Sequence, residues 1–282
     1  MFISFPTKID LSACEFDCHF ANDHQITAVD VVMSERHAAT LAQIKALRHV
    51  LHTYGVRCAS FSLVGCNHLV VHAEQRQQMK SLRDRACEYA SILDASVFVT
   101  TSGMRSTVLD ENAYMFAQEL RHTIATVQAR GMRFAVQMDA TGFVDGIMAY
   151  ERIWSLIGQV YCVFDPVALV QNGGDVLAFL HKHANKIAHV RAADVLCRDD
   201  VRIASPPVGM GDLRWGPMLS LLYEGGYHGA LSITPDGGFW NRNAQRHRMI
   251  LLSQHHLNQY LFDADNESVL ANKVTSLYGR MV

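Results

Sequence analysis

Short apolar runs alternate with helical patterns along this chain, and this alternation restricts the possible folds more than any other feature. Eight runs rich in β-branched and aromatic residues predict strands, at residues 2–5, 27–32, 57–64, 96–101, 133–138, 161–164, 186–195 and 229–234. Most of these runs are apolar throughout, as is typical of parallel strands covered on both faces. Between them, apolar residues recur at three- and four-residue spacing, which predicts helices.

The longest helical patterns lie at residues 35–55, 77–95, 112–131, 175–186 and 243–262. Eight strands with interleaved helices in 282 residues predict an α/β protein with a single (β/α)8 TIM barrel. A doubly wound open sheet is the alternative, but the segment FISFPTKIDLSACEF after the first strand lacks a glycine-rich phosphate loop. Without any linker or low-complexity tract, we expect one domain over residues 1–282. A C-terminal extension from about residue 263 would fold over the barrel or against a second subunit.

Composition excludes several partners. The net charge is −2 with no cluster of Lys and Arg, so we expect no nucleic acid. No apolar run approaches the roughly 20 residues of a membrane-spanning helix, and the N-terminus lacks a secretion signal, so we expect a cytoplasmic protein. Seven scattered cysteines without a C-x-x-C pair favour reduced thiols. Cys14 and Cys18 could share a helix face with His19, but two half-buried thiols are a simpler interpretation than a metal site.

Polar residues follow the predicted strands at the end where barrels of this class keep their active sites. The strand ends contribute Asp30, His68, Arg105, Gln137, Asp139, Asp165, His189, Arg191 and Thr234. The loop PVGMGDLRWG adds Gly209 and Gly211 on either side of one residue, which indicates a backbone that approaches another group closely. This convergence predicts a site for a polar small molecule.

Three segments carry a family resemblance: YCVFDPVAL, GGDVLAFLHKHANKIAHVRAADV and PVGMGDLRWGPMLSLLYEGGYHGALSIT. They resemble the last three β/α units of the xylose-isomerase-like TIM barrels, which include sugar and sugar-phosphate isomerases, epimerases and dehydratases related to endonuclease IV. The resemblance is specific over about residues 160–235 and weaker from the second strand onward. It implies that the Gly-x-Gly loop borders the substrate pocket.

The resemblance also implies a divalent metal held by Glu, Asp, His and Glu at the ends of strands five to eight, with the two glutamates as acid and base. Here Gln137 stands at the first glutamate, and Asp165 matches the aspartate. Arg191 stands at the ligand histidine, with His189 two residues earlier on the same face, and Thr234 replaces the last glutamate.

These substitutions disfavour a metal. Gln137 and Thr234 are uncharged, and the fixed positive charge of Arg191 repels a cation. We therefore expect no metal cofactor. The alternative is a divalent metal such as Mn or Zn, held by Asp165 and a displaced ligand. Arg191 would take over the metal's electrostatic role by receiving an anion, or it forms only a structural ion pair with Asp165 or Asp194.

The expected site therefore has two groups of residues. The acid–base candidates are Asp165, Asp139 and His68, and the substrate-binding candidates are Arg191, Gln137, Asp30, Thr234, His189 and Arg105. We expect a sugar isomerase- or epimerase-like barrel that acts without the usual metal on a small polyhydroxy carbonyl or acidic sugar compound. The alternative is a non-catalytic barrel that binds a small anion or a partner protein. The resemblance also implies a homo-oligomer.

Overall fold

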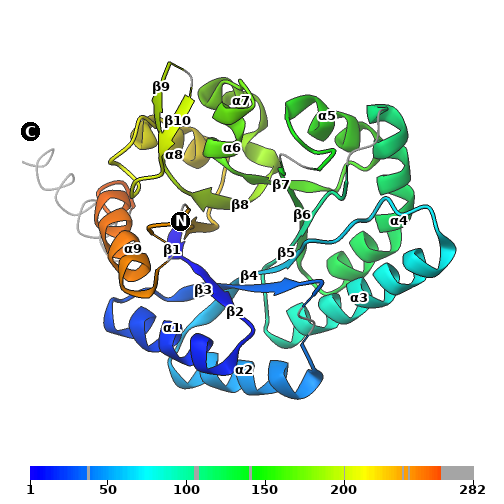
Figure 1. Cartoon of the computed structure of the whole chain (residues 1–282), viewed down its shortest axis with the longest axis horizontal. Helices are drawn as coiled ribbons and strands as arrows, with labels where there is room; N and C mark the ends of the chain where they lie inside the picture. The colour runs from blue at the N-terminus through cyan, green and yellow to red at the C-terminus, as the bar shows by residue number, and fades with distance from the viewer. Residues whose placement is uncertain are drawn as a thin grey trace, which may run out of the picture.

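A ring of parallel strands surrounded by helices forms the body of the protein (Figure 1). The computed structural model describes residues 1–36, 39–104, 108–139, 142–199, 201–236, 238–240 and 242–261. In chain order the ring strands are β1 (Phe2–Ser4), β2 (Pro6–Lys8), β3 (Ala28–Ser34), β4 (Arg57–Val64), β5 (Val97–Thr101), β6 (Arg133–Gln137), β7 (Tyr161–Phe164), β8 (Ile187–Ala192) and β11 (Ala230–Ile233).

The first strand of the chain closes this ring. β1 pairs with β11, and β2 pairs with β3, so the two edges of the sheet are consecutive in sequence. Only Phe5 separates them, and its carbonyl accepts the backbone N–H of Asp30 at 2.9 Å. Counted as one interrupted strand, β1 and β2 complete an eight-stranded barrel. The predicted TIM barrel is therefore confirmed, and the open-sheet alternative is wrong.

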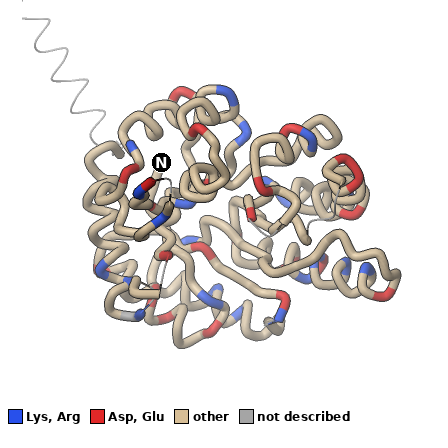
Figure 2. The backbone as a smooth tube through the Cα atoms, turned by 45° about the horizontal axis from the view of Figure 1, so that its top comes forward, with Lys and Arg blue, Asp and Glu red and all other residues tan. Residues whose placement is uncertain are grey.

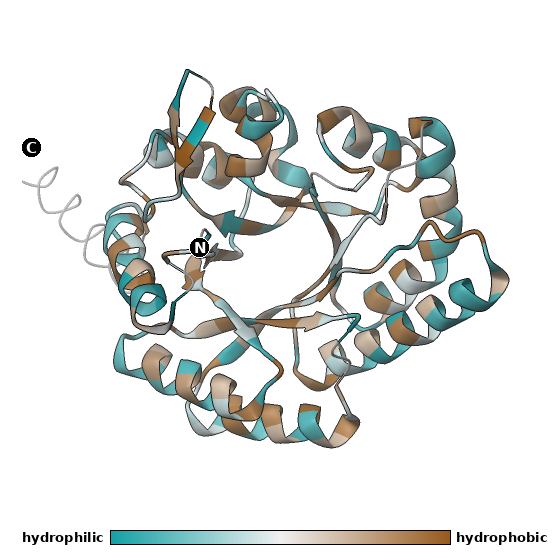
Figure 3. Ribbon diagram, in the orientation of Figure 1, coloured by the Kyte–Doolittle hydropathy of each residue, from teal (hydrophilic) through white to brown (hydrophobic). Residues whose placement is uncertain are grey.

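Helices cover the outside of the ring, and apolar and polar residues alternate along them (Figure 3). They are α1 (Leu11–Asp23), α2 (Leu41–Thr53), α3 (Ala73–Ile92), α4 (Leu109–Ala129), α5 (Ile147–Leu156), α6 (Pro166–Gln171), α7 (Val176–His183), the 3-10 turn η1 (Ala184–Lys186), α8 (Trp215–Glu224) and α9 (Asn243–Leu257). The helix predicted from residue 35 begins at Leu41, because Thr40 and Gln43 form a capping box there.

Two apolar layers hold the barrel together. The outer layer lies between strands and helices and contains the stacked rings of Phe61, Phe98 and Phe134. The inner layer fills the barrel with small side chains such as Val99 and Ala135. Because the inner residues are small, space remains above them at the barrel mouth.

The segment after the seventh barrel strand differs from its prediction. The strand expected to reach residue 195 ends at Ala192. The chain then forms an antiparallel hairpin of β9 (Leu196–Arg198) and β10 (Val201–Ala204), which the sequence pattern did not predict. The expected C-terminal extension lies outside the described residues.

Charged residues of both signs are interspersed along the chain (Figure 2). In the described part of the chain, no helix combines the length and the apolar character needed to cross a membrane.

Candidate functional site

A cavity of about 210 Å³ opens at the mouth of the barrel. Besides Ser62 and Ser232, five polar side chains line it: Asp30 from β3, Gln137 from β6, His189 and Arg191 from β8, and Thr234 just after β11. All five belong to the predicted substrate-binding group, and the structure brings them together. We call this space the mouth cavity.

Asp30 is the most densely bonded group of the mouth cavity. Its Oδ2 accepts a hydrogen bond from Ser4 Oγ at 2.6 Å, and its Oδ1 accepts one from Ser60 Oγ at 2.8 Å. The Nε2 atom of His189 lies 3.5 Å from the same Oδ1, and both side chains are buried. The two serines were missed by the sequence analysis, although they are polar residues within otherwise apolar strands. They orient the carboxylate so that one oxygen faces the imidazole.

Burial lowers the pKa of His189 below its ordinary value. The negative charge of Asp30 opposes this effect, while the positive charge of Arg191 adds to it. At neutral pH the imidazole is therefore uncharged and can accept a proton. A neutral base beside a fixed guanidinium is an arrangement suited to removing a proton from a bound compound.

Arg191 and Asp165 form an ion pair beside the mouth cavity, with 3.2 Å between Nη1 and Oδ2. The other oxygen of Asp165 caps α6 by accepting the backbone N–H of Ala168 at 3.0 Å. Both oxygens of Asp165 thus have structural partners, and Asp165 is not among the residues that line the cavity. Arg191 does line it, and its side chain is 28% exposed, so it remains accessible to a ligand.

The structure places His68 away from the mouth cavity, which argues against its expected role as an acid–base group. The ring is only 1% exposed. Its Nε2 bonds to Thr100 Oγ1 at 2.8 Å, and its Nδ1 lies 3.3 Å from Arg83 Nη1. Burial lowers the pKa of His68 to about 3, with a further contribution from Arg83. His68 is thus a neutral, bonded core residue at physiological pH.

Two further candidates are not placed at the cavity. Asp139 lies half-buried in the loop after β6, where its backbone N–H donates to the Val144 carbonyl at 2.9 Å, and it does not line the mouth cavity. Arg105 falls outside the described residues. None of the three acid–base candidates therefore lines the mouth cavity, whereas five of the six binding candidates do.

The Gly-x-Gly loop is wrapped around a side chain of its own chain. The Asp194 carboxylate accepts hydrogen bonds from the backbone N–H groups of Val195, Gly209, Gly211 and Leu213, at 2.9, 2.9, 3.3 and 3.2 Å. A Cβ atom at Gly211 would lie 2.2 Å from Asp194 Oδ1, so the close approach requires glycine. No residue of this loop lines the mouth cavity. The expectation that the loop borders the pocket is therefore not supported, because its donors are used within the loop.

The donor set at the mouth does not suit a divalent metal. Within the described ranges, no group of three or more His, Cys, Asp and Glu side chains could hold one. The Asp165 carboxylate, which matches the family's metal-binding aspartate, faces the guanidinium of Arg191 instead. A metal there would have to approach a fixed positive charge within a few ångströms.

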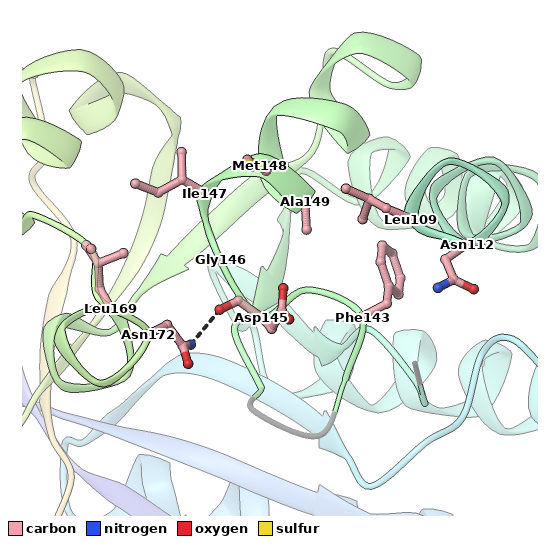
Figure 4. A pocket seen from close by; sticks show the side chains of 11 residues that line it. Leu109, Asn112, Phe143, Asp145, Gly146, Ile147, Met148, Ala149, Leu169 and Asn172 are labelled. Atoms are coloured by element: carbon pink, nitrogen blue, oxygen red, sulfur yellow. Dashed lines mark hydrogen bonds between the residues drawn. The ribbon is translucent and has the colours of Figure 1, made fainter. Parts of the chain in front are cut away.

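A second cavity, of about 520 Å³, lies between α4, α5 and α6 (Figure 4). Its walls are mostly apolar, with contributions from Leu109, Phe143 and Ile147. The Asn172 side chain donates to the backbone carbonyl of Asp145 at 2.5 Å across one side. None of the predicted site residues lines this cavity, and it lacks the convergent titratable groups of the mouth.

Solved structures share this architecture. A D-tagatose 3-epimerase-like protein is 20% identical, with a TM-score of 0.73 over 97% of this chain and 100% of the other. A D-psicose 3-epimerase from Clostridium cellulolyticum H10, solved with D-tagatose, is 11% identical, with a TM-score of 0.75 over 93% and 100%. The IolI protein with a bound zinc atom is 13% identical, with a TM-score of 0.74 over 93% and 100%. At these identities the likeness shows the fold alone.

Comparison at the level of sequence identifies the family. No curated protein sequence matches the chain significantly. The family model described as xylose isomerase-like TIM barrel matches residues 18–253, which is most of the chain. The chain therefore belongs to the xylose isomerase-like TIM barrel family.

Proposed function

We propose that the mouth cavity binds a small polyhydroxy carbonyl or acidic sugar compound and moves a proton on the carbon next to its carbonyl group, without a resident metal. One observation carries this proposal: the His189 imidazole, backed by Asp30, and the guanidinium of Arg191 line the same cavity. The epimerases among the structural neighbours support the reaction class, because epimerisation next to a carbonyl begins with the same removal of a proton from carbon.

Each of the five predicted residues at the mouth cavity has a defined task in this reaction. Arg191 binds the carbonyl or carboxylate oxygen and stabilises the negative charge that develops there. His189 takes the proton from carbon, and the electron pair moves into the enolate. The same imidazolium then returns the proton, on the same face, to the neighbouring carbon, while the proton of the neighbouring hydroxyl group passes to the former carbonyl oxygen. Asp30 fixes the ring and stabilises the imidazolium. The Gln137 amide and the Thr234 hydroxyl can bind substrate hydroxyl groups.

A non-catalytic barrel is the competing function. Gln137 and Thr234 stand where the resemblance places two proton-transferring glutamates, and neither can act as a carboxylate base. In that case Arg191 would still select an anion, but the bound compound would exchange no proton with water. Binding and exchange must therefore be measured separately.

The first experiment is a melting scan against a panel of sugar acids and sugar phosphates. A ligand at a hundredfold excess over its Kd stabilises the native state by about 2.7 kcal/mol, a rise of roughly 5–10 °C in Tm. Arg191→Gln should abolish the rise. The control Arg152→Gln breaks an ion pair with Asp110 (2.7 Å) outside the mouth and should retain it. A panel that leaves the wild-type Tm unchanged would refute the proposal.

The second experiment measures exchange of carbon-bound hydrogen with deuterium oxide by NMR, using the compound that binds. The wild type should exchange, and the rate should fall as the pH drops and His189 becomes protonated. His189→Gln should lower exchange at least 100-fold while the Tm response persists. Binding without exchange would establish the non-catalytic alternative. Elemental analysis of protein purified without chelator should find well under one equivalent of Mn, Zn, Mg or Fe.

A further inference from the structure

A larger cavity adjoins the mouth cavity. It has a volume of about 760 Å³ and lies between β2, α1, α9 and the segment that follows β11. Pro6, Val32 and Thr234 line both cavities, so the two spaces share these walls. Figure 1 shows α1 and α9 on the same side of the barrel, and Arg246 on α9 bonds to Asp17 on α1. We call this space the outer cavity.

A stack of three aromatic rings lies at the outer cavity, and two of them, Phe16 and His247, line it. The His247 imidazole lies between Phe20, at 3.8 Å between ring centroids and 9° between planes, and Phe16, at 5.0 Å and 22°. Phe16 ends the stack, lines the cavity and is 60% exposed. Burial lowers the pKa of His247, so the middle ring is neutral at physiological pH. Another flat ring could extend this stack on the open side of Phe16.

The charges around the outer cavity favour an anion. Asp17 is buried, accepts a hydrogen bond from Thr7 Oγ1 at 2.7 Å and pairs with Arg246 at 2.5 Å. This aspartate and arginine therefore neutralise each other. Lys8 also lines the cavity, is exposed, and makes no ion pair with any described residue. Its ammonium group leaves the cavity with a local positive charge.

We infer that the outer cavity holds the aromatic group of an elongated, acidic ligand whose polar end occupies the mouth cavity. The substrate class would then be an aryl-linked sugar acid rather than a free sugar. The aromatic group stacks on Phe16, and an acidic or other acceptor group lies within reach of Lys8. The placement of the polar end rests on the proposed function, whereas the aromatic site rests on the outer cavity alone.

Anilinonaphthalene sulfonate, an aromatic anion, tests the outer cavity on the full-length folded protein. Its fluorescence should report saturable binding, which Phe16→Ala should weaken about tenfold through lost aromatic contact. Lys8→Gln should weaken it about threefold, as expected for an exposed charge pair. The control Tyr114→Ala removes a ring of similar exposure (56%) on α4 and should change nothing. If the affinity for the dye is unchanged in both Phe16→Ala and Lys8→Gln, the aromatic site is refuted, independently of any result for the mouth cavity.

A matched pair of compounds tests whether one ligand spans both cavities. D-glucuronate and para-nitrophenyl β-D-glucuronide share the acidic sugar and differ in the aromatic ring. Calorimetry should show at least tenfold tighter binding of the aryl compound, and Phe16→Ala should remove this difference without changing glucuronate binding. Equal affinity of the two compounds, including no binding of either, would overturn the spanning ligand. A Tm response to other sugar acids that requires Arg191 would still uphold the proposed function.

Discussion

Replacing Asp194 by alanine should destabilise the fold more than most single substitutions. The carboxylate is 1% exposed and accepts four backbone N–H groups from the turn after β8 and the Gly-x-Gly loop. Each buried donor that loses its partner costs about 1–3 kcal/mol, and water entering the vacated space recovers part of this cost. Removal of the buried charge gives a further offset, because burial raises the pKa of Asp194. We expect a net loss of about 3–5 kcal/mol.

Urea denaturation and calorimetry measure this loss. For a chain of this length it corresponds to a decrease of roughly 10 °C in Tm. The matched control is Asp175→Ala, which removes another carboxylate that accepts two backbone N–H groups, at 2.9 and 3.0 Å, but at the exposed start of α7. Loss of such a cap costs about 1 kcal/mol. If Asp194→Ala costs no more than Asp175→Ala, the loop does not depend on the buried carboxylate and the reasoning fails.

Three further predictions test individual groups. Burial lowers the pKa of His68 from 6.5 to about 3, so below pH 6.5 the unfolded chain binds a proton that the folded chain does not. The free energy of unfolding should therefore fall with decreasing pH, by up to ~1.4 kcal/mol per pH unit. In urea titrations at pH 7 and pH 5, His68→Gln should show a smaller fall than the wild type, and an equal fall in the two proteins would contradict the prediction. Gly211→Ala should lower the Tm by several degrees because its Cβ would collide with Asp194. The control Gly158→Ala, whose Cβ would have nothing within 4 Å, should leave the Tm unchanged. Equal Tm values for the two variants would contradict the close contact between Gly211 and Asp194. Asp30→Asn should reduce proton exchange of the bound ligand more than tenfold at unchanged Kd, and a change in Kd alone would remove its role in positioning His189.

The barrel was predictable from sequence because strands that are buried on both faces are apolar throughout, and such runs are visible in the sequence. The predicted strands at residues 57–64 and 161–164 have the observed bounds, since apolar runs there end at polar or glycine residues. The hairpin of β9 and β10 was missed because the residue with positive φ in its turn is Asp199, at +52°, and not a glycine. Sequence patterns identify such turns mainly by glycine or asparagine.

The mouth cavity was predictable in its binding residues but not in its proton-transfer groups. Strand positions such as Gln137 and Arg191 point into the mouth because alternate residues of a strand face the barrel interior. The positions of loop residues such as His68 depend on tertiary packing instead, and the His68 ring contacts Arg83 of α3. The pairing of His189 with Asp30 joins β8 to β3, a contact between distant segments that no local pattern encodes.

The interrupted first strand has a consequence for how the barrel is assembled. Phe2 pairs with Ala230, while Pro6, four residues later, pairs with Asp30. The β2 half of this strand therefore pairs with β3, which follows closely in the chain. The β1 half cannot pair until β11, the last barrel strand, has been synthesised. At 5–20 residues per second, the wait on a ribosome is on the order of 10–50 s. During that time both edges of the growing sheet have unpaired backbone groups, which other chains can contact. Ring closure is thus a late step of high contact order, and it sets the period in which this chain is most prone to aggregate.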